Sequence, residues 1–474
     1  MGTSRTPNRA LRGLLSRTGW TEDQLARHIN TLAAETGLIL RLDRRSVAHW
    51  LAGRRPRPPV PGLIVEAFTR GLGHALTLDD VGLGPRARAP RDLGASGGRG
   101  PTGPRAGSVP PRDAATTLAR LAQVEDHRRQ TGPGAVYSLA ALTVPSWNQA
   151  IARRPRPLPD ARSSPPWGPG PVVAAEHMAW VFSDLDITFG GGHSRTALAH
   201  YLAHQVMPHL RARFGPALRR RLLATTTQMV YLCGFMCFDN QQHALAQRYY
   251  RIALDMATEN NDPGAYASTL RAMSVQAYDL SHHQHALTLA EAAATTSRAL
   301  PPVRQAFLYG QVAVASAATG ARTDALSALR TAERHLEKAT SRAAPSTDDA
   351  APPGPYHAAP MGHYHPAALA CQEAAVRALL GDCAGAGAAL AASLRLRPVV
   401  ERRSRAITTA HLAELQLQRG HLEQATRTWH AFLDDVPHLN CGRVTVALNT
   451  LRSRLQPHAT HAAAKNLLAR AAAL

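Results

Sequence analysis

The sequence has few aromatic residues, few cysteines and no long apolar run. Aromatics make up 5% of its 474 residues, so a packed core must come mainly from alanine and leucine, which favour helices over sheets. Five cysteines are too few for a disulfide framework, which indicates a reducing cytoplasm. No apolar stretch reaches the roughly 18 residues of a membrane span, and none follows the arginines of residues 1–13. We therefore expect a cytoplasmic protein with no signal peptide and no membrane contact.

Lysine is also nearly absent, although the chain is strongly basic. Lys and Arg together number 54 against 33 acidic residues, a formal net charge of +21, yet only Lys338 and Lys465 are lysine. This bias is typical of a GC-rich genome, so part of the charge reflects codon usage rather than binding. The composition favours a soluble, mostly helical protein, and the length allows about three domains at roughly 150 residues each.

Two segments rich in proline divide the chain. Residues 84–112 hold six Pro, seven Gly, six Arg and one Asp, a composition that cannot bury enough apolar surface to offset its ordering entropy. We predict a flexible linker there and a loop insertion at 341–366. The expected domains are a small helical DNA-binding domain at 1–83, a connecting segment with one helix at 113–171, and a helical unit at 172–474.

The long unit contains a repeat of about 40 residues. The repeated pattern is an alanine, a large residue four places later and a small residue three places after that. It recurs in phase along the unit, most clearly at 246–253. Two amphipathic helices per period predict an α-solenoid, in which each helical pair covers the apolar face of the next. The leading alanines are Ala246, Ala286, Ala325, Ala386 and Ala425.

This pattern resembles the tetratricopeptide repeat over roughly 220–440. Gly234 supplies the small residue that the family has twelve places before its second-helix alanine, and Pro437 lies where the family has its closing proline. The resemblance implies a concave groove that binds a peptide or a protein partner, or that pairs with a second copy of the chain.

The N-terminal region has clear helix starts. Thr21 and Gln24 are spaced as a capping box, in which each side chain pairs with the other residue's backbone N–H. Asp43 is placed to cap a helix over 44–52, and Gly53 follows that helix as a stop signal.

These residues resemble the helix-turn-helix of lambda-repressor-type (XRE-like) regulators, through the segments 20–26 and 46–56. Ala26 and Trp50 are 24 positions apart, more than the family usually allows. The second helix must therefore be longer, or the turn carries an insertion through 36–38. With its linker and repeats, the chain resembles the actinobacterial NsdA-like regulators of differentiation and antibiotic production. That resemblance implies a homodimeric transcriptional regulator that binds double-stranded DNA.

A helical wheel over the third helix supports DNA binding. Val47, Trp50 and Leu51 gather on one side, which must be the core, while Arg45 and His49 point the opposite way. An arginine in the first turn of a helix in the major groove can pair with guanine, and arginines after the helix suit phosphates. The predicted DNA-binding residues are Thr21, Gln24, Arg44, Arg45, Ser46, His49, Arg54, Arg55 and Arg57.

A competing interpretation needs no DNA. Residues 1–83 hold twelve arginines and seven acidic residues, a modest excess in an arginine-rich chain, and a basic helix is often only a solvated face. The alternative is a repeat-based protein-interaction adaptor whose N-terminal domain is a degenerate helix-turn-helix.

No motif indicates catalysis. Asp184 and Asp186 are two apart and so face different sides of a helix, and no nucleophile–base set or Rossmann fingerprint is present. The run from Gly190 to Gly192 precedes a helix and could hold an anion, but it lacks the ending of a phosphate-binding loop. We interpret it as a tight turn capped by Ser194 and expect no enzyme.

The spacing of the cysteines and histidines does not match that of known zinc-binding motifs. Cys233 and Cys237 share one face of a helix, which predicts core packing. We expect no metal and no cofactor at the remaining candidates, which are His282, His283, His285, His357, His363, His365 and Cys371.

Overall fold

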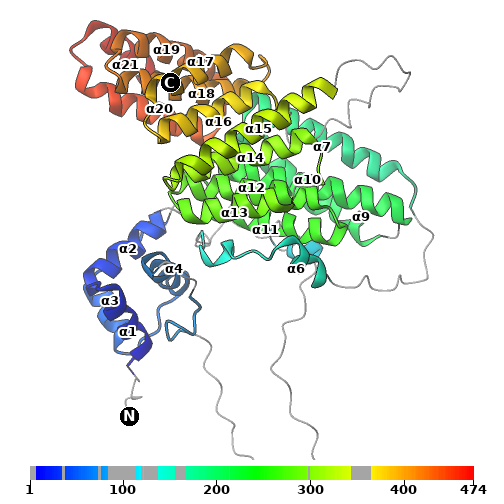
Figure 1. Cartoon of the computed structure of the whole chain (residues 1–474). Helices are drawn as coiled ribbons and strands as arrows, with labels where there is room; N and C mark the ends of the chain where they lie inside the picture. The colour runs from blue at the N-terminus through cyan, green and yellow to red at the C-terminus, as the bar shows by residue number, and fades with distance from the viewer. Residues whose placement is uncertain are drawn as a thin grey trace, which may run out of the picture. The chain divides into compact units, whose positions relative to one another are not determined.

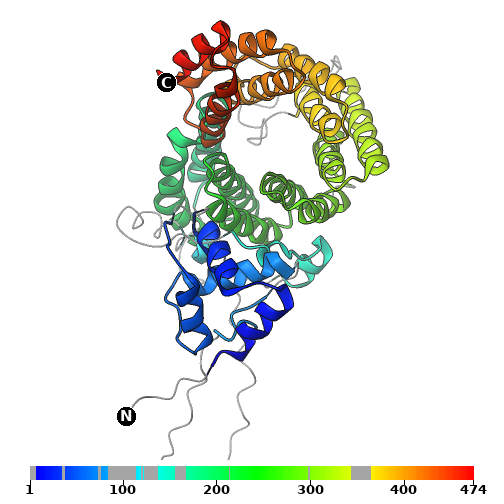
Figure 2. The same cartoon turned by 90° about the vertical axis from the view of Figure 1, so that its left-hand side faces the viewer.

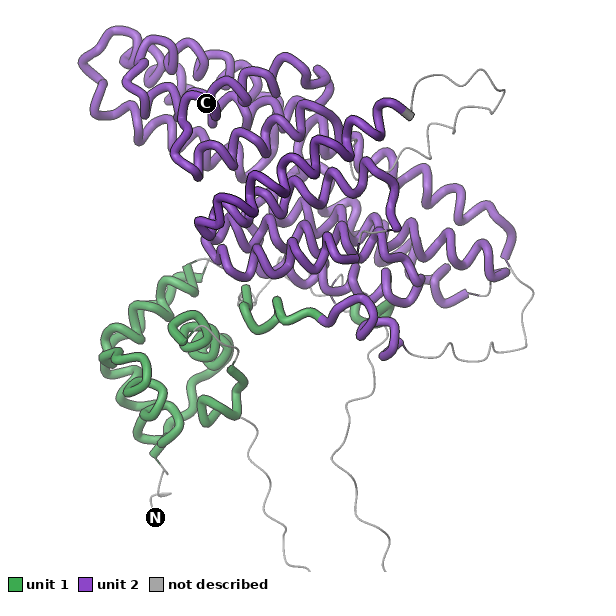
Figure 3. Tube along the Cα trace, in the orientation of Figure 1, with its two compact units in different colours: residues 1–117, 125–144 green, residues 118–124, 145–474 purple. Residues whose placement is uncertain are grey.

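The structure is a computed structural model in which every regular element of the described residues is helical (Figure 1), which confirms the predicted all-α class. None of the described helices combines the length and apolar character needed to cross a membrane. The chain forms two compact units, residues 1–117 with 125–144 and residues 118–124 with 145–474 (Figure 3). The described residues are 7–34, 38–72, 76–83, 114–118, 121, 137–154, 167–212, 214–296, 299–342 and 364–474. The predicted linker 84–112 and most of the loop 341–366 lie outside them.

The first unit is built on four helices, with leucines from each of them in its core. Asn8 caps the first helix by accepting the backbone N–H of Leu11, and Gly19 ends that helix in the left-handed conformation, at φ 67°. Helix α2 contacts both α3 and α4. The helices are α1 (Arg9–Thr18), α2 (Glu22–Ala34), α3 (Arg44–Leu51) and α4 (Val60–Leu72).

Part of the predicted connecting segment packs with these helices. Glu66 on α4 is buried, pairs with Arg70 at 3.0 Å, and accepts the backbone N–H of Leu139 at 3.2 Å. Burial raises the pKa of Glu66, against the opposing effect of Arg70. The first unit therefore includes residues after the linker, among them the short helix η1 (Ala140–Leu142).

The second unit is a succession of antiparallel helical pairs. It starts with α6 (Trp147–Ala152), α7 (Gly170–Phe189), α8 (Gly191–Tyr201), the π-helical turn η2 (Leu202–Val206) and α9 (Met207–Arg211). Five pairs follow: α10 (Pro216–Asp239) with α11 (His243–Asn260), α12 (Pro263–Asp279) with α13 (His283–Thr296), α14 (Pro302–Ala318) with α15 (Arg322–Arg342), α16 (Pro366–Leu379) with α17 (Cys383–Leu396), and α18 (Arg402–Gln418) with α19 (Leu422–Asp435). The chain then continues through η3 (Val436–His438), α20 (Gly442–Leu455), η4 (Gln456–His458) and α21 (Ala462–Ala472).

The predicted repeat is confirmed by the packing of these pairs. All five leading alanines lie on the second helix of a pair and are 0% exposed. A Cβ on Gly234 would lie 2.8 Å from the ring of Tyr250, so helices α10 and α11 approach closely only because this position is small. The same position, twelve residues before each leading alanine, is small in every pair: Gly234, Ser274, Ala313, Ala374 and Ala413.

The turns within the pairs repeat in the same phase. In each of the five pairs one turn residue has a positive φ, between 61° and 85°. Three of these residues are glycine, which adopts this conformation without steric cost, and two are not. They are Gln241, Ser281, Gly320, Gly381 and Gly420.

The second unit closes on itself, which the sequence does not indicate. The first helices of successive pairs contact one another, from α10 through α12 and α14 to α16, and α18 contacts α7. Asn440 donates its backbone N–H to Phe189 O and accepts the N–H of Gly192, both at 2.9 Å. Figure 2 shows the pairs following a curve that brings the C-terminal helices back beside α7. The repeats thus form a ring rather than an open solenoid.

The glycine run is where the ring closes. A Cβ on Gly191 would lie 2.8 Å from the Cα of Met236, and a Cβ on Gly192 would lie 2.7 Å from the backbone oxygen of Asn440. Gly190 has φ 84° and joins α7 to α8. Glycine is needed here because two other backbones pass at van der Waals distance.

The expectation that Ser194 caps this turn is wrong. No side chain caps α8, and Ser194 lies inside its first turn, 4% exposed. Its hydroxyl faces the sulfur of Met236 at 4.0 Å, because the close approach of α10 buries this face of the helix.

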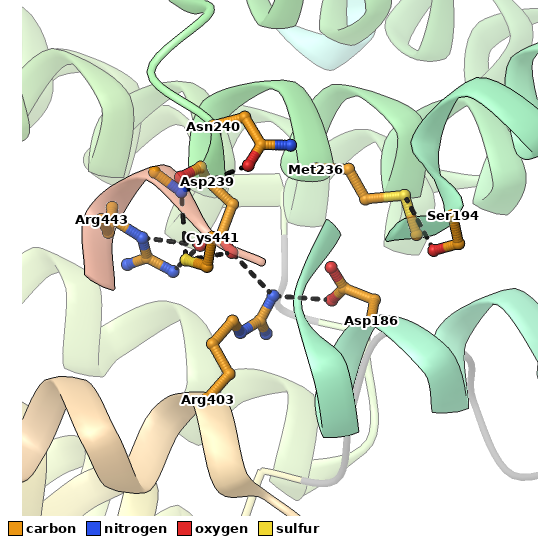
Figure 4. A network of polar contacts seen from close by, with 9 residues as sticks. Asp186, Ser194, Met236, Asp239, Asn240, Arg403, Cys441 and Arg443 are labelled. Atoms are coloured by element: carbon orange, nitrogen blue, oxygen red, sulfur yellow. Dashed lines mark hydrogen bonds and ion pairs between the residues drawn. The ribbon is translucent and has the colours of Figure 1, made fainter. Parts of the chain in front are cut away.

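A buried charge network also lies where the ring closes, between α7, α10, α18 and α20, a place called the seam from here on (Figure 4). Arg403 Nη1 lies 2.8 Å from Asp186 Oδ2 and 3.4 Å from Asp239 Oδ2. Arg443 also pairs with Asp239, with Nε 2.6 Å from Oδ1, and the thiol of Cys441 donates to Asp239 Oδ2 at 2.8 Å. Two arginines therefore face two carboxylates across α7, α10, α18 and α20.

The pKa values of the two carboxylates of this network are shifted in opposite directions. Burial, opposed by Arg403, raises the pKa of Asp186 to about 6. Burial also disfavours the charge on Asp239, but Arg443 and Arg403 outweigh it, so the pKa of Asp239 is lowered. Burial raises the pKa of the Cys441 thiol to about 12, so the thiol stays protonated and donates to the carboxylate.

Candidate nucleic-acid interface

Helix α3 begins where the sequence predicts. Asp43 Oδ1 accepts the Ser46 N–H at 2.9 Å and the Ser46 hydroxyl at 2.8 Å. These bonds, the backbone one first, lower the pKa of Asp43. The helix ends at Leu51 rather than Ala52, which is its C-cap, and Gly53 follows with φ 92°.

The predicted two faces of α3 are confirmed. Val47, Trp50 and Leu51 are 0%, 6% and 5% exposed and belong to the core of the first unit. Arg45 and His49 are exposed on the opposite side. Ala48 is exposed between them, and its small side chain leaves room for another surface to approach.

Three of the predicted site residues take part in capping the N-termini of helices. The Thr21 N–H donates to Gln24 Oε1 at 2.8 Å and the Gln24 N–H donates to Thr21 Oγ1 at 3.2 Å, which confirms the capping box. Ser46 is held by Asp43 in the same way. These side chains position α2 and α3.

Two of the predicted arginines are tied to their own unit. Arg44 Nε lies 3.4 Å from Glu22 Oε2, which links the first turns of α2 and α3. The guanidinium of Arg55 donates to the backbone oxygen of Leu83. Arg55 therefore anchors residues far along the chain to the segment after α3.

The remaining four candidates are exposed. Arg45, His49, Arg54 and Arg57 are on the surface, and their side chains make no hydrogen bond or ion pair to any residue that the structure describes. They lie on α3 and on the segment that follows it. A face with unpaired arginines is suited to an anionic partner.

The connection between α2 and α3 spans residues 35–43, longer than the 3–4-residue turn of a helix-turn-helix. Asn30 holds its last part, donating to Leu42 O at 2.9 Å and accepting the Leu42 N–H at 3.0 Å. Leu38, in the predicted insertion, donates its N–H to Ala33 O at 2.9 Å, while 35–37 lie outside the described residues. Sequence reasoning missed Asn30, because an asparagine inside a helix carries no sign of a partner twelve residues away.

Three of the other candidate residues have structural roles. Cys233 and Cys237 are 0% exposed, which confirms core packing. His365 Nε2 lies 2.7 Å from Glu401 Oε1. Among the described residues no group of three or more His, Cys, Asp or Glu is placed to hold a metal ion; His357 and His363 lie outside them.

Asp184 and Asp186 face different sides of α7, as their spacing predicts. Asp184 is exposed, whereas Asp186 is 2% exposed and bound to Arg403. They form no paired-carboxylate site.

Comparison with known protein families finds a match in the N-terminal region. Residues 11–84 match the family described as the SP15 N-terminal domain, a range that spans most of α1 and all of α2 to α4. No curated protein matches the chain.

Proposed function

We propose that the chain is a DNA-binding transcriptional regulator of differentiation or secondary metabolism and that α3 lies in the major groove of double-stranded DNA. The observation that carries the proposal is the division of α3 into a core face and an exposed face with Arg45 and His49. The arginine fork can donate two hydrogen bonds to guanine O6 and N7. The neighbouring alanine allows the helix to approach the bases.

Arg54 and Arg57 would contact phosphates. Both are exposed and have no partner among the described residues, and phosphate contacts require charge rather than a fixed base-reading geometry. Arg55, bound to Leu83 O, would position this segment.

The helical repeats would bind a peptide or protein partner, or a second copy of the chain. Regulators with a lambda-type domain bind paired half-sites as dimers, which is the reason for expecting a homodimer. The support for a partner-binding role is that first helices of successive pairs contact one another, from α10 to α16, which in a curved stack of helical pairs favours their lying on its inner side.

One observation favours the adaptor instead. The connection 35–43 separates α2 from α3 by more than a helix-turn-helix allows, so these helices need not dock on DNA as a motif. In this alternative the exposed face of α3 contacts an acidic protein surface.

Titration of the full chain against duplex DNA separates the two functions. The preferred duplex is first selected from a random pool, and a scrambled duplex serves as the comparison. Arg45→Ala should cost about 1–3 kcal/mol on the preferred duplex and much less on the scrambled one. Arg12→Ala, which removes an exposed arginine from α1, is the matched control and should change neither.

Salt dependence is the second readout. Binding should weaken as salt rises, with a log–log slope of about 0.9 per phosphate contact. No binding at low salt, or binding that ignores salt, supports the adaptor.

A further inference from the structure

Neighbouring helical pairs share apolar cores, but the core next to the seam does not extend across it. One described cluster of buried apolar residues includes Ala306 on α14, Ala325 on α15 and Val376 on α16, so it joins two pairs. Another joins α16 and α17 to α18. The described cluster around Trp429 takes its buried members from α18 to α21 and from Cys441, with none from α7, α8 or α10. Burial of apolar surface, the main favourable contribution to packing, therefore does not extend from this cluster across the seam.

Polar groups make contacts across the seam instead. On the C-terminal side these groups belong to Arg403 and to residues 440–443. The backbone of Asn440 bonds to the turn between α7 and α8, and the Gly442 N–H donates to Asn240 Oδ1 at 3.2 Å. Contacts carried by so few residues can break in one step while the helical pairs on both sides stay intact.

The burial of charge makes closure of the ring costly. Arg403, Asp186 and Asp239 are 7%, 2% and 0% exposed. Asp186 Oδ1 is buried and has no hydrogen-bond partner among the described residues. The free energy lost when charges leave water can exceed what their mutual attraction returns, and a buried acceptor without a donor adds to the loss. Opening the seam returns these groups to water, so hydration offsets much of the interaction that opening breaks.

We propose that the seam is a latch, at which the ring opens into an open array of helical pairs when Arg403 and residues 440–443 leave α7, α8 and α10. Every pair stays folded during this opening. The second unit then has two states, closed and open, and a partner that binds one of them more tightly shifts their ratio. The proposal goes beyond DNA binding and does not depend on it.

Cys441 is a natural probe of this opening. It is 3% exposed, and its thiol points at Asp239 across the seam, with Sγ 2.8 Å from Oδ2 (Figure 4). Burial raises the pKa of the thiol to about 12, and Arg403 acts in the opposite direction. Thiol reagents react with the thiolate. Opening frees the thiol from Asp239 and exposes it to water, so Cys441 becomes reactive.

Cys237 on α10 is the internal control. It is 0% exposed. Burial, Tyr231 and Cys237 raise the pKa of Tyr250 on α11, which places Cys237 beside α11. Opening of the seam leaves α10 and α11 packed together, so Cys237 becomes reactive only when this pair unfolds.

Pulse labelling of the full chain with iodoacetamide, followed by mass spectrometry of the labelled peptides, tests the proposal. At neutral pH, Cys441 of the wild type should be labelled at least about tenfold faster than Cys237, because local opening requires less free energy than unfolding. The labelling rate of Cys441 should rise weakly with urea, since opening exposes little surface, and that of Cys237 should rise steeply. Equal rates with the same steep dependence would show that the seam opens only on unfolding, which would overturn the proposal.

Arg403→Gln distinguishes opening of the seam from a change in the thiol itself. The variant removes an ion-pair partner of both carboxylates, so labelling of Cys441 should become at least about tenfold faster. Without opening, the loss of a positive charge near the thiol would raise its pKa further and slow the labelling. Arg405→Gln is the matched control, because Arg405 pairs with Asp435 inside the α18–α19 pair, and it should leave the rate at Cys441 unchanged.

Two results with these variants would contradict the latch. One is slower labelling of Cys441 in Arg403→Gln, and the other is an equal change in both variants. Labelling of Cys237 in each variant checks that the helical pairs remain folded. If Arg403→Gln unfolds, the two urea dependences of the wild type decide by themselves.

Discussion

Arg45 in the first unit and Arg403 in the second unit differ in their surroundings. On α3 of the first unit, Arg45 is exposed and makes no hydrogen bond or ion pair to any described residue. At the seam of the second unit the Arg403 side chain is 8% exposed and faces two carboxylates. Exposed pairs contribute little to stability, whereas breaking a buried pair is strongly destabilising. An arginine-rich composition therefore says nothing about function until each guanidinium has been assigned a partner.

The comparison predicts its largest effect at the seam. Asp239→Asn leaves Arg443 without its carboxylate partner and leaves Arg403 with Asp186 alone, so it should lower the free energy of unfolding by about 3–5 kcal/mol at pH 7. Chemical denaturation of the full chain measures this loss. Asp186→Asn is the control and should cost much less, because burial already disfavours the charge on Asp186. Equal losses would show that the two carboxylates do not differ.

The same pair predicts a pH dependence. The pKa of Asp186 is raised in the folded state from an ordinary value of 3.8 to about 6, so the folded state binds more protons than the unfolded state between these values. The contribution of Asp186 to stability should therefore decrease as pH rises from about 4 to about 6 and stay constant above that. Asp186→Asn removes this decrease. Denaturation curves at several pH values check it, and a contribution that increases with pH would contradict the assignment.

A smaller effect is expected where α2 holds the connection to α3. Asn30→Ala removes both hydrogen bonds to Leu42 and should destabilise the first unit by about 1–3 kcal/mol. Thr31→Ala, on the exposed side of the same helix, should have little effect. If the two variants unfold alike, the side chain of Asn30 does not hold the connection.

The smallest effects should separate two adjacent arginines. Arg55→Ala should lower stability by about 1 kcal/mol through the lost bond to Leu83. Arg54→Ala should leave stability unchanged and reduce the salt slope of DNA binding by about 0.9. Thermal melts and salt titrations of both variants measure the two quantities. A lower salt slope and an unchanged stability for Arg55→Ala would show instead that Arg55 contacts the DNA.

Local signals explain how much of the first unit could be predicted. The capping boxes at Thr21 and Asp43 depend on residues three positions apart, and the faces of α3 depend on a period of 3.6 residues. These rules operate within one or two helical turns. They located the exposed arginines but not their partners, since Arg55 reaches Leu83 and Arg44 reaches Glu22 across the fold.

In the second unit the sequence by itself determined the helical pairs, through small residues spaced at the period of the repeat. Only the tertiary structure decided that the repeats close. Asp186 meets Arg403 across 217 positions and Asp239 meets Cys441 across 202, and no periodicity connects them. The sequence predicts a turn at the glycines 190–192, because a turn requires only that the backbone of these residues can adopt unusual conformations. Their requirement for close approach arises when a backbone about 250 residues away passes beside them, and that depends on the summed curvature of all the pairs between.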